Sequence, residues 1–157
     1  MPPVVYLAHP VAPTAEQAAE IRLLVADATD EEVTTTLVAR NLGSARSWLR
    51  WLVEHTDWAV CAPWMPYVEV LPDDGQIRER GLRDDCAMAA RCDAIVLCGG
   101  RVSSGMQREL DAVVAAGGAV IDLTAVGAHP PDSPRAGLIT ASMRSALSHG
   151  ARAWRAG

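Results

Sequence analysis

The sequence predicts an α/β protein. We expect a Rossmann-like or flavodoxin-like three-layer sandwich whose parallel sheet has four to five strands. Three observations point to this fold. Short β-branched runs alternate with longer stretches that are apolar at helical spacing. The run at 93–98 is apolar after its first residue, as in a strand buried on both faces. The length of 157 residues fits a single domain, 1–157.

The first half of the chain begins with a strand, followed by helices. Val4–Ala8 is apolar, begins with two β-branched valines and is predicted to form a buried strand. Thr14 to Gln17 has the form of a capping box, so a helix is expected over 18–28. The threonines at 34–36 weaken a helix there, because β-branched side chains lose rotamer freedom. Asn41 is therefore expected to cap a second, stronger helix.

The middle of the chain repeats this alternation. Trp58–Ala62 is predicted to form the second strand, and the two prolines within 63–67 predict a loop after it. A helix is expected over Asp73–Arg91, interrupted or kinked near Gly81. Asp93–Cys98 is predicted to form the third strand.

The last third is expected to complete the sheet. Ser104 to Gln107 has the form of another capping box, which predicts a helix up to Gly117-Gly118. Ala119–Leu123 is predicted to form the fourth strand. Ser133-Pro134 resembles a cap followed by proline at the first helical position, so a final helix is expected to run toward Arg152.

Composition argues against several function classes. The net charge is −5, so the chain lacks a basic surface for nucleic acid. No apolar run approaches the ~18 residues of a membrane span, and Met1–Val5 lacks the basic flank of a signal peptide. We therefore expect a cytoplasmic protein. All 14 basic residues are arginine, which excludes Schiff bases and Walker-A chemistry.

Metal binding is not expected. The four cysteines include no C-x-x-C pair and are predicted to be buried free thiols. The four histidines are scattered along the chain. We expect no metal and no other cofactor.

The predicted fold gathers three loops around one crevice. Ligands of such folds bind outside the carboxyl ends of the strands. Those ends are followed by Ala8-His9-Pro10, by 62–67 and by 99–109. The crevice is therefore the expected ligand site.

The small-residue loop at 99–109 is the richest of the three. Backbone N–H groups at a helix N-terminus suit an anion, and Arg101 adds a positive charge. Ser104 is expected to cap the helix, leaving Ser103 to face a ligand. Glu109 lies about a turn inside the helix and is expected to stay ionised near the positive end of the dipole. The alternative interpretation is a plain strand-to-helix turn.

The order and spacing of short motifs resemble the nucleoside 2-deoxyribosyltransferase superfamily, including its 2′-deoxynucleoside 5′-monophosphate N-glycosidase branch. The residues that carry the resemblance are Tyr6 in the first strand, Asp85 before Cys92-Asp93, and Ser103-x-Gly105-x-x-x-Glu109. It covers the chain from Val4 to Thr124. The chain also looks like uncharacterised phage and actinobacterial relatives of that superfamily.

The resemblance implies roles for these residues. Glu109 matches the carboxylate that attacks the anomeric carbon, and Asp85 matches the group that hydrogen-bonds or protonates the departing base. Tyr6 matches the tyrosine that orients the nucleophile. Ser103 matches the position that holds the sugar 5′ end, where serine in place of aspartate favours a 5′-monophosphate.

Other residues are expected to complete the substrate site. Those at its phosphate side are Gly105, Arg101, Ser104 and His9. Trp64 is expected either to stack on the base or to close over the core. Without the resemblance, Tyr6 reads as a core residue and Asp85 as part of a solvated helix face.

The sequence also departs from the superfamily. His9-Pro10-Val11 stands where the phosphate-binding branch has an arginine, so Arg101 is expected to supply that charge. Asp111 adds an acid near the site or on the solvent face. Residues 12–40 exceed the usual first connection and are expected to form a lid or an oligomer contact.

Three functions remain open on the sequence alone. The first is cleavage of the N-glycosidic bond of a nucleoside 5′-monophosphate, with water or a second base as acceptor. The second is a phosphoribohydrolase of the cytokinin-activating type, although its P-G-G-x-G-T-x-x-E motif is not matched. The third is a nucleotide-binding module without turnover.

A homodimer or higher homo-oligomer is expected. Trp48 and Trp51 suggest either helix packing or a subunit contact. The last helix region carries more apolar residues than one sheet face needs. These are Leu138, Ile139, Met143, Leu147 and Trp154.

Overall fold

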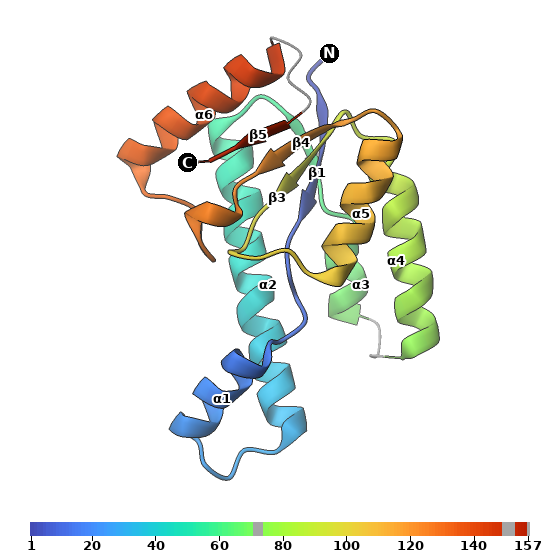
Figure 1. Ribbon diagram of the computed structural model, residues 1–157. Coiled ribbons are helices and arrows are strands. Elements are labelled where there is room, and N and C mark those ends of the chain that lie inside the picture. Colours follow the sequence, from blue (N-terminus) through green and yellow to red (C-terminus); the bar gives the residue numbers. More distant parts are fainter. Residues whose placement is uncertain (71–73, 149–152, 157) are drawn as a thin grey trace.

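A computed structural model describes residues 1–70, 74–148 and 153–156 and shows a parallel sheet between two layers of helices (Figure 1). The sheet has five strands in the order β2-β1-β3-β4-β5, and every neighbouring pair is parallel. The strands are β1 (Val4–Ala8), β2 (Ala59–Cys61), β3 (Ala94–Leu97), β4 (Ala119–Asp122) and β5 (Ala153–Arg155). This order is flavodoxin-like, so the predicted fold class is confirmed.

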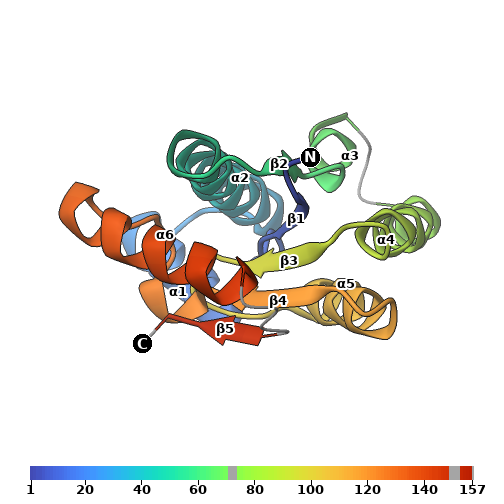
Figure 2. The same cartoon turned by 90° about the horizontal axis from the view of Figure 1, so that it is seen from above.

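The helices divide between the two faces of the sheet (Figure 2). The long helix α2 (Asp30–His55) and α6 (Ser133–Ser148) cover one face. On the other face α4 (Gly75–Ala89) packs against α5 (Ser104–Ala115), and α3 (Trp64–Val70) packs against α4. Every residue of β3 is buried, as the apolar run predicts.

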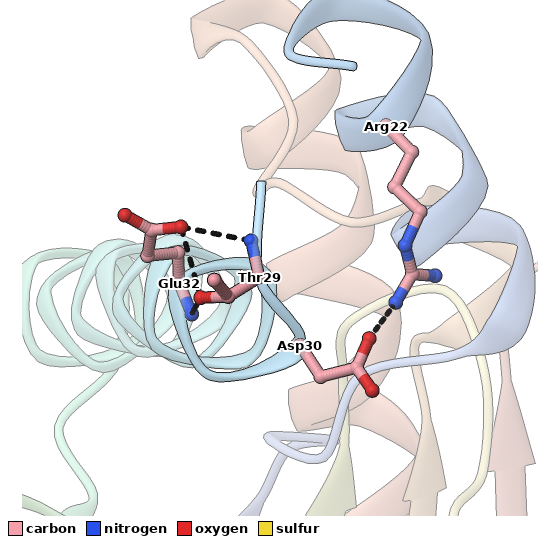
Figure 3. A network of polar contacts seen from close by, with 4 residues as sticks. All are labelled: Arg22, Thr29, Asp30 and Glu32. Carbon is pink, nitrogen blue, oxygen red and sulfur yellow. Dashed lines mark hydrogen bonds and ion pairs between the residues drawn. The ribbon is translucent and has the colours of Figure 1, made fainter. Parts of the chain in front are cut away.

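The long helix α2 corrects the prediction that Asn41 caps a helix. A single helix of 26 residues begins after Thr29, which caps it by accepting a hydrogen bond from the Glu32 N–H. The Glu32 carboxylate in turn accepts a hydrogen bond from the Thr29 N–H at 2.8 Å (Figure 3). The β-branched residues at 34–36 do not break the helix, because each costs only about 0.5 kcal/mol relative to alanine.

A short helix precedes α2 and is joined to it by an ion pair. Helix α1 (Ala15–Leu24) begins at the predicted capping box of Thr14 and Gln17 but ends before residue 28. Arg22 in its last turn pairs with Asp30 in the first turn of α2 (Figure 3). No residue of α1 is buried. Whether residues 12–40 act as a lid or an oligomer contact stays a prediction.

The predicted loop at 63–67 is wrong, because α3 begins at Trp64. Pro66 lies in its first turn, where a backbone N–H has no intrahelical partner to lose. The helix predicted over Asp73–Arg91 is α4, which Asp74 caps and which continues through Gly81 without interruption.

The C-terminal strand was not among the expected elements. A run of three residues, Ala153–Arg155, carries too little periodicity to be recognised. The predicted end of the last helix near Arg152 lies outside the described residues, and α6 is described to Ser148.

Part of the apolar surface expected to drive oligomerisation belongs to the core. Trp48 and Trp51 are buried and pack edge to face, so their helix-packing interpretation is confirmed. Ile139 and Met143 are also buried, whereas Leu138 is 76% exposed. The side chains of Leu147 and Trp154 do not belong to the part of the chain that the structure describes. The oligomeric state therefore stays a prediction.

Candidate active site

Tyr6 and Glu109 meet inside the protein although 103 residues separate them. Tyr6 lies in the middle of β1, and Glu109 lies on α5, which covers that face of the sheet. The Tyr6 hydroxyl donates a hydrogen bond to Glu109 Oε1 at 2.8 Å. Tyr6 is fully buried and Glu109 is 6% exposed. The tyrosine therefore fixes the orientation of the carboxyl group.

Asp85 brings a second buried carboxyl group from α4. It is 6% exposed, and its Oδ1 makes no hydrogen bond with the described residues. The Asp85 carboxylate raises the pKa of both Glu109 and Tyr6, which indicates that the three groups act on one another. Asp85 is thus a buried acid and not part of a solvated face.

Helices α4 and α5 are joined at the surface beside this site. Arg108 of α5 makes two hydrogen bonds to the Glu79 carboxylate of α4, at 2.8 and 3.0 Å. The guanidinium fork matches a carboxylate in this way. The pair helps to fix the register between the two helices that carry Glu109 and Asp85.

The protonation of Glu109 differs from the prediction that it stays ionised. Burial, supported by the charge of Asp85, raises the pKa of Glu109 to about 8, against the opposing hydrogen bond from Tyr6. Glu109 is the sixth residue of α5, beyond the first turn in which the helix dipole acts. Desolvation therefore dominates, and the carboxyl group is mostly protonated at neutral pH.

Asp85 titrates below Glu109. Burial first, and then the charge of Asp84, raises the pKa of Asp85 to about 6. Between these two values Asp85 and Glu109 together hold one proton. One acid and one base in a single buried site is what glycosidic bond cleavage requires.

Because Glu109 is buried, we expect the free energy of unfolding to fall as the pH rises. Its folded-state pKa of about 8 exceeds the ordinary 4.5, so the stabilisation is complete below pH 4.5 and is lost as the pH rises toward 8. The loss is roughly 3–5 kcal/mol. Urea unfolding at pH 5 and pH 8.5 should show a much larger decrease for the wild type than for Glu109→Gln. Equal decreases would contradict the buried, protonated carboxyl group.

The structure corrects which of the two serines caps α5. Ser103, not Ser104, is the N-cap: its hydroxyl accepts a hydrogen bond from the Met106 N–H at 3.3 Å. Ser104 is exposed, and Gly105 follows in the first turn. Two adjacent serines fit a cap equally well by sequence, so the pattern could not decide between them.

Trp64 is not available to stack on a base. It is buried, and its indole Nε1 donates a hydrogen bond to the Leu7 carbonyl at 2.8 Å. Its position in the first turn of α3 points the ring into the core. The core interpretation of Trp64 is therefore right.

The side chains of His9 and Arg101 lie toward α1 and α2 instead of Glu109. His9 Nε2 is 3.0 Å from Ser44 Oγ of α2, and the Arg101 guanidinium donates to the Ala12 carbonyl. Both residues line a pocket of about 200 Å³ that neither Tyr6, Asp85 nor Glu109 lines.

This pocket includes residues that the sequence reasoning missed. Asn41 is buried, donates to the Val11 carbonyl at 2.9 Å and accepts from Gln17. Ser44 lies one turn further along the same face of α2. Both residues are polar but lie on the apolar face of an amphipathic helix, and this mismatch is the sequence signal that could have identified them.

Some remaining groups lie outside both sites. Asp111 is exposed and accepts a hydrogen bond from Gln107, so it belongs to the solvent face. The Cys61 and Cys92 sulfur atoms lie 3.6 Å apart as free thiols.

Within 1–70, 74–148 and 153–156, no three His, Cys, Asp or Glu side chains are grouped as a metal would need. No helix of these ranges is long and apolar enough to cross a membrane.

The fold and the site define a flavodoxin-like α/β protein with a buried tyrosine and two carboxyl groups between β1, α4 and α5. Residues 3–121 match the model of a family described as a domain of unknown function (DUF7768). The chain belongs to this family, and the match includes all three residues of the candidate site. No curated protein matches the chain.

Proposed function

We propose that the protein cleaves the N-glycosidic bond of a nucleoside or deoxynucleoside 5′-monophosphate, with Glu109 as the nucleophile. The reactive form is the less populated one, in which the single proton shared by the two carboxyl groups has moved from Glu109 to Asp85. The ionised Glu109 carboxylate then attacks the anomeric carbon, and the bond from that carbon to the base nitrogen breaks. Asp85 gives its proton to the departing base, and Tyr6 holds Glu109 in position. The product of this step is a free base and a glycosyl ester on Glu109.

The second half of the reaction releases the sugar. Water, or a second nucleobase, attacks the anomeric carbon of the ester and gives a proton to the Asp85 carboxylate. Glu109 leaves as a carboxylate, and both side chains return to their starting state. The identity of the acceptor decides between a hydrolase and a transferase.

One observation carries the proposal: the Tyr6–Glu109 hydrogen bond beside the unpartnered Asp85 Oδ1. Neither carboxyl group forms a salt bridge within the described part of the chain. Burying two such groups together without a cation lowers stability. Strongly perturbed carboxyl groups of this kind are typical of catalytic sites.

The direct test is incubation of the full chain with a panel of nucleoside 5′-monophosphates, with free base measured by chromatography. We expect release of base from at least one nucleotide. Adding a second base and looking for a new nucleotide separates transfer from hydrolysis. Binding without any release would favour a nucleotide-binding module, and neither binding nor release would contradict the proposal.

We expect a preference for 5′-monophosphates over nucleosides. The phosphate would face the N-terminus of α5, where Ser103 caps the helix without adding a negative charge. Ser103→Asp keeps a good cap but repels phosphate, so kcat/KM for the monophosphate should fall at least tenfold relative to that for the nucleoside.

Ser103→Asn is the matched control for that substitution, since asparagine caps helices as well as aspartate but carries no charge. It should keep the preference of the wild type. Equal turnover of monophosphates and nucleosides by the unaltered protein would argue against a phosphate seat at Ser103.

A further inference from the structure

The pocket beside α1 and α2 has the composition of an anion site. Two guanidinium groups, those of Arg40 and Arg101, and two imidazole rings, those of His9 and His129, line it, and no carboxylate does. This is unexpected in a chain whose net charge is −5. We infer that the pocket is a second site, separate from the Tyr6–Glu109 site, that binds the phosphate group of a small metabolite.

The charge of Arg101 is the main attraction for such a group. Arg101 donates to the Ala12 carbonyl and forms no salt bridge with the described residues. Arg40, which also lines the pocket, lies 3.6 Å from the Glu20 carboxylate, a loose and exposed pair. An incoming phosphate would therefore meet one guanidinium without a carboxylate partner and one that is weakly paired. Each guanidinium can donate two parallel hydrogen bonds to the phosphate oxygens.

The hydrogen bonds of His9 also point to an anion. Its Nδ1 lies 3.0 Å from the Pro10 carbonyl, which can only accept, so Nδ1 carries a proton. Its Nε2 faces Ser44 Oγ, whose single proton is directed to the Ala128 carbonyl. With the Ser44 proton on the Ala128 carbonyl, both nitrogens of His9 must be protonated. Because that carbonyl also accepts from Trp48 Nε1, the Ser44 proton can instead turn to Nε2 and leave His9 neutral.

The surroundings of His9 oppose its protonation. Burial lowers the pKa of His9 to about 4, against the opposing hydrogen bonds to the Pro10 and Ala128 carbonyls, and the nearby charges of Arg101 and His129 lower it further. The other charged groups of the pocket region are Arg40 and its partner Glu20. A phosphate in the pocket would offset this positive surplus, so its binding should take up a proton at His9.

Glycine at position 99 brings the two loops of the pocket together. Gly99 has φ +89°, and a Cβ there would lie 2.6 Å from both His9 Nε2 and Pro10 Cδ. Only glycine allows the segment after β3 to approach the segment after β1 this closely. The pocket therefore lies at the switch point between β1 and β3, where sheets with this strand order bind ligands.

The size of the pocket sets the class of ligand. About 200 Å³ is below the roughly 300–1,000 Å³ typical of pockets that enclose whole drug-sized ligands. It accommodates a phosphate group with few further atoms. The bound molecule is thus a small phosphorylated metabolite or free phosphate.

Calorimetric titration of the full chain with inorganic phosphate, at constant ionic strength set by chloride, tests the inference. We expect saturable binding of phosphate. Sulfate, which stays a dianion between pH 7.5 and pH 6, should occupy the same site and bind more tightly at the lower pH. Arg101→Gln should weaken binding at least tenfold. Arg50→Gln is the matched control, because Arg50 is exposed on α2 and pairs with Glu54, and its affinity should be unchanged.

Two further variants keep the test decisive. His129 is exposed, so His129→Gln should fold even if Arg101→Gln does not, and it should weaken binding about threefold. Glu109→Gln should bind phosphate like the wild type. Absence of a saturable site, or wild-type affinity in both Arg101→Gln and His129→Gln, would overturn the inference. Loss of binding in Glu109→Gln would assign the phosphate to the Tyr6–Glu109 site instead.

Discussion

Glu109→Gln is expected to abolish base release while nucleotide binding survives. Glutamine keeps the size of the side chain and can still accept the Tyr6 hydrogen bond, but it cannot form a glycosyl ester. The loss of kcat should be on the order of a thousandfold or more. Single-turnover assays with free base detected by chromatography measure the effect, and Glu109→Ala should behave in the same way.

Glu54→Gln provides the control for this substitution. Glu54 is exposed on α2 and pairs with Arg50, far along the chain from the candidate site. This variant should release base at the wild-type rate. If Glu109→Gln retained most of the activity, the nucleophile would have been assigned to the wrong residue.

Asp85→Asn should change both the rate and its pH dependence. In the wild type, Asp85 and Glu109 share one proton between about pH 6 and about pH 8, so kcat/KM should follow a bell with limbs near these values. Asparagine cannot donate a proton to the base, so the rate should fall about a hundredfold. The alkaline limb should disappear, because only Glu109 then titrates.

Asp84→Asn separates the role of Asp85 from that of its neighbour. The charge of Asp84 raises the pKa of Asp85, so its removal should move the acid limb to lower pH while activity near pH 7 is kept. A pH profile of Asp85→Asn that kept both limbs would contradict the role of Asp85 as the acid.

The sequence predicted the sheet better than the helix boundaries. The β-branched and apolar runs at β1 and β3 were recognised because both strands are buried on two faces. The start of α2 differs from the predicted one, because the three threonines weaken the helix only slightly and the capping box at Thr29 fixes an earlier beginning. Pro66 suggests a loop in the sequence, but the first turn of a helix tolerates proline, and α3 forms around it.

The sequence predicted which residues form the candidate site but not the protonation of its carboxyl groups. Tyr6, Asp85 and Glu109 were singled out by resemblance, and the structure brings Tyr6 and Glu109 into contact. The raised pKa of Glu109 could not be predicted, because burial depends on which residues pack across α4 and α5. The pocket of His9 and Arg101 depends in the same way on loops that meet only in the folded chain.

The most direct test of the central claim is the mass of the protein during turnover. The full chain is mixed with a nucleoside 5′-monophosphate that it cleaves, quenched in acid within the first turnover, and measured intact and after proteolysis. The proposed mechanism predicts a gain of one sugar phosphate on the peptide that contains Glu109, in step with released base, and no such gain in Glu109→Gln. Base release in the first turnover without this adduct, or an adduct that persists in Glu109→Gln, would contradict it.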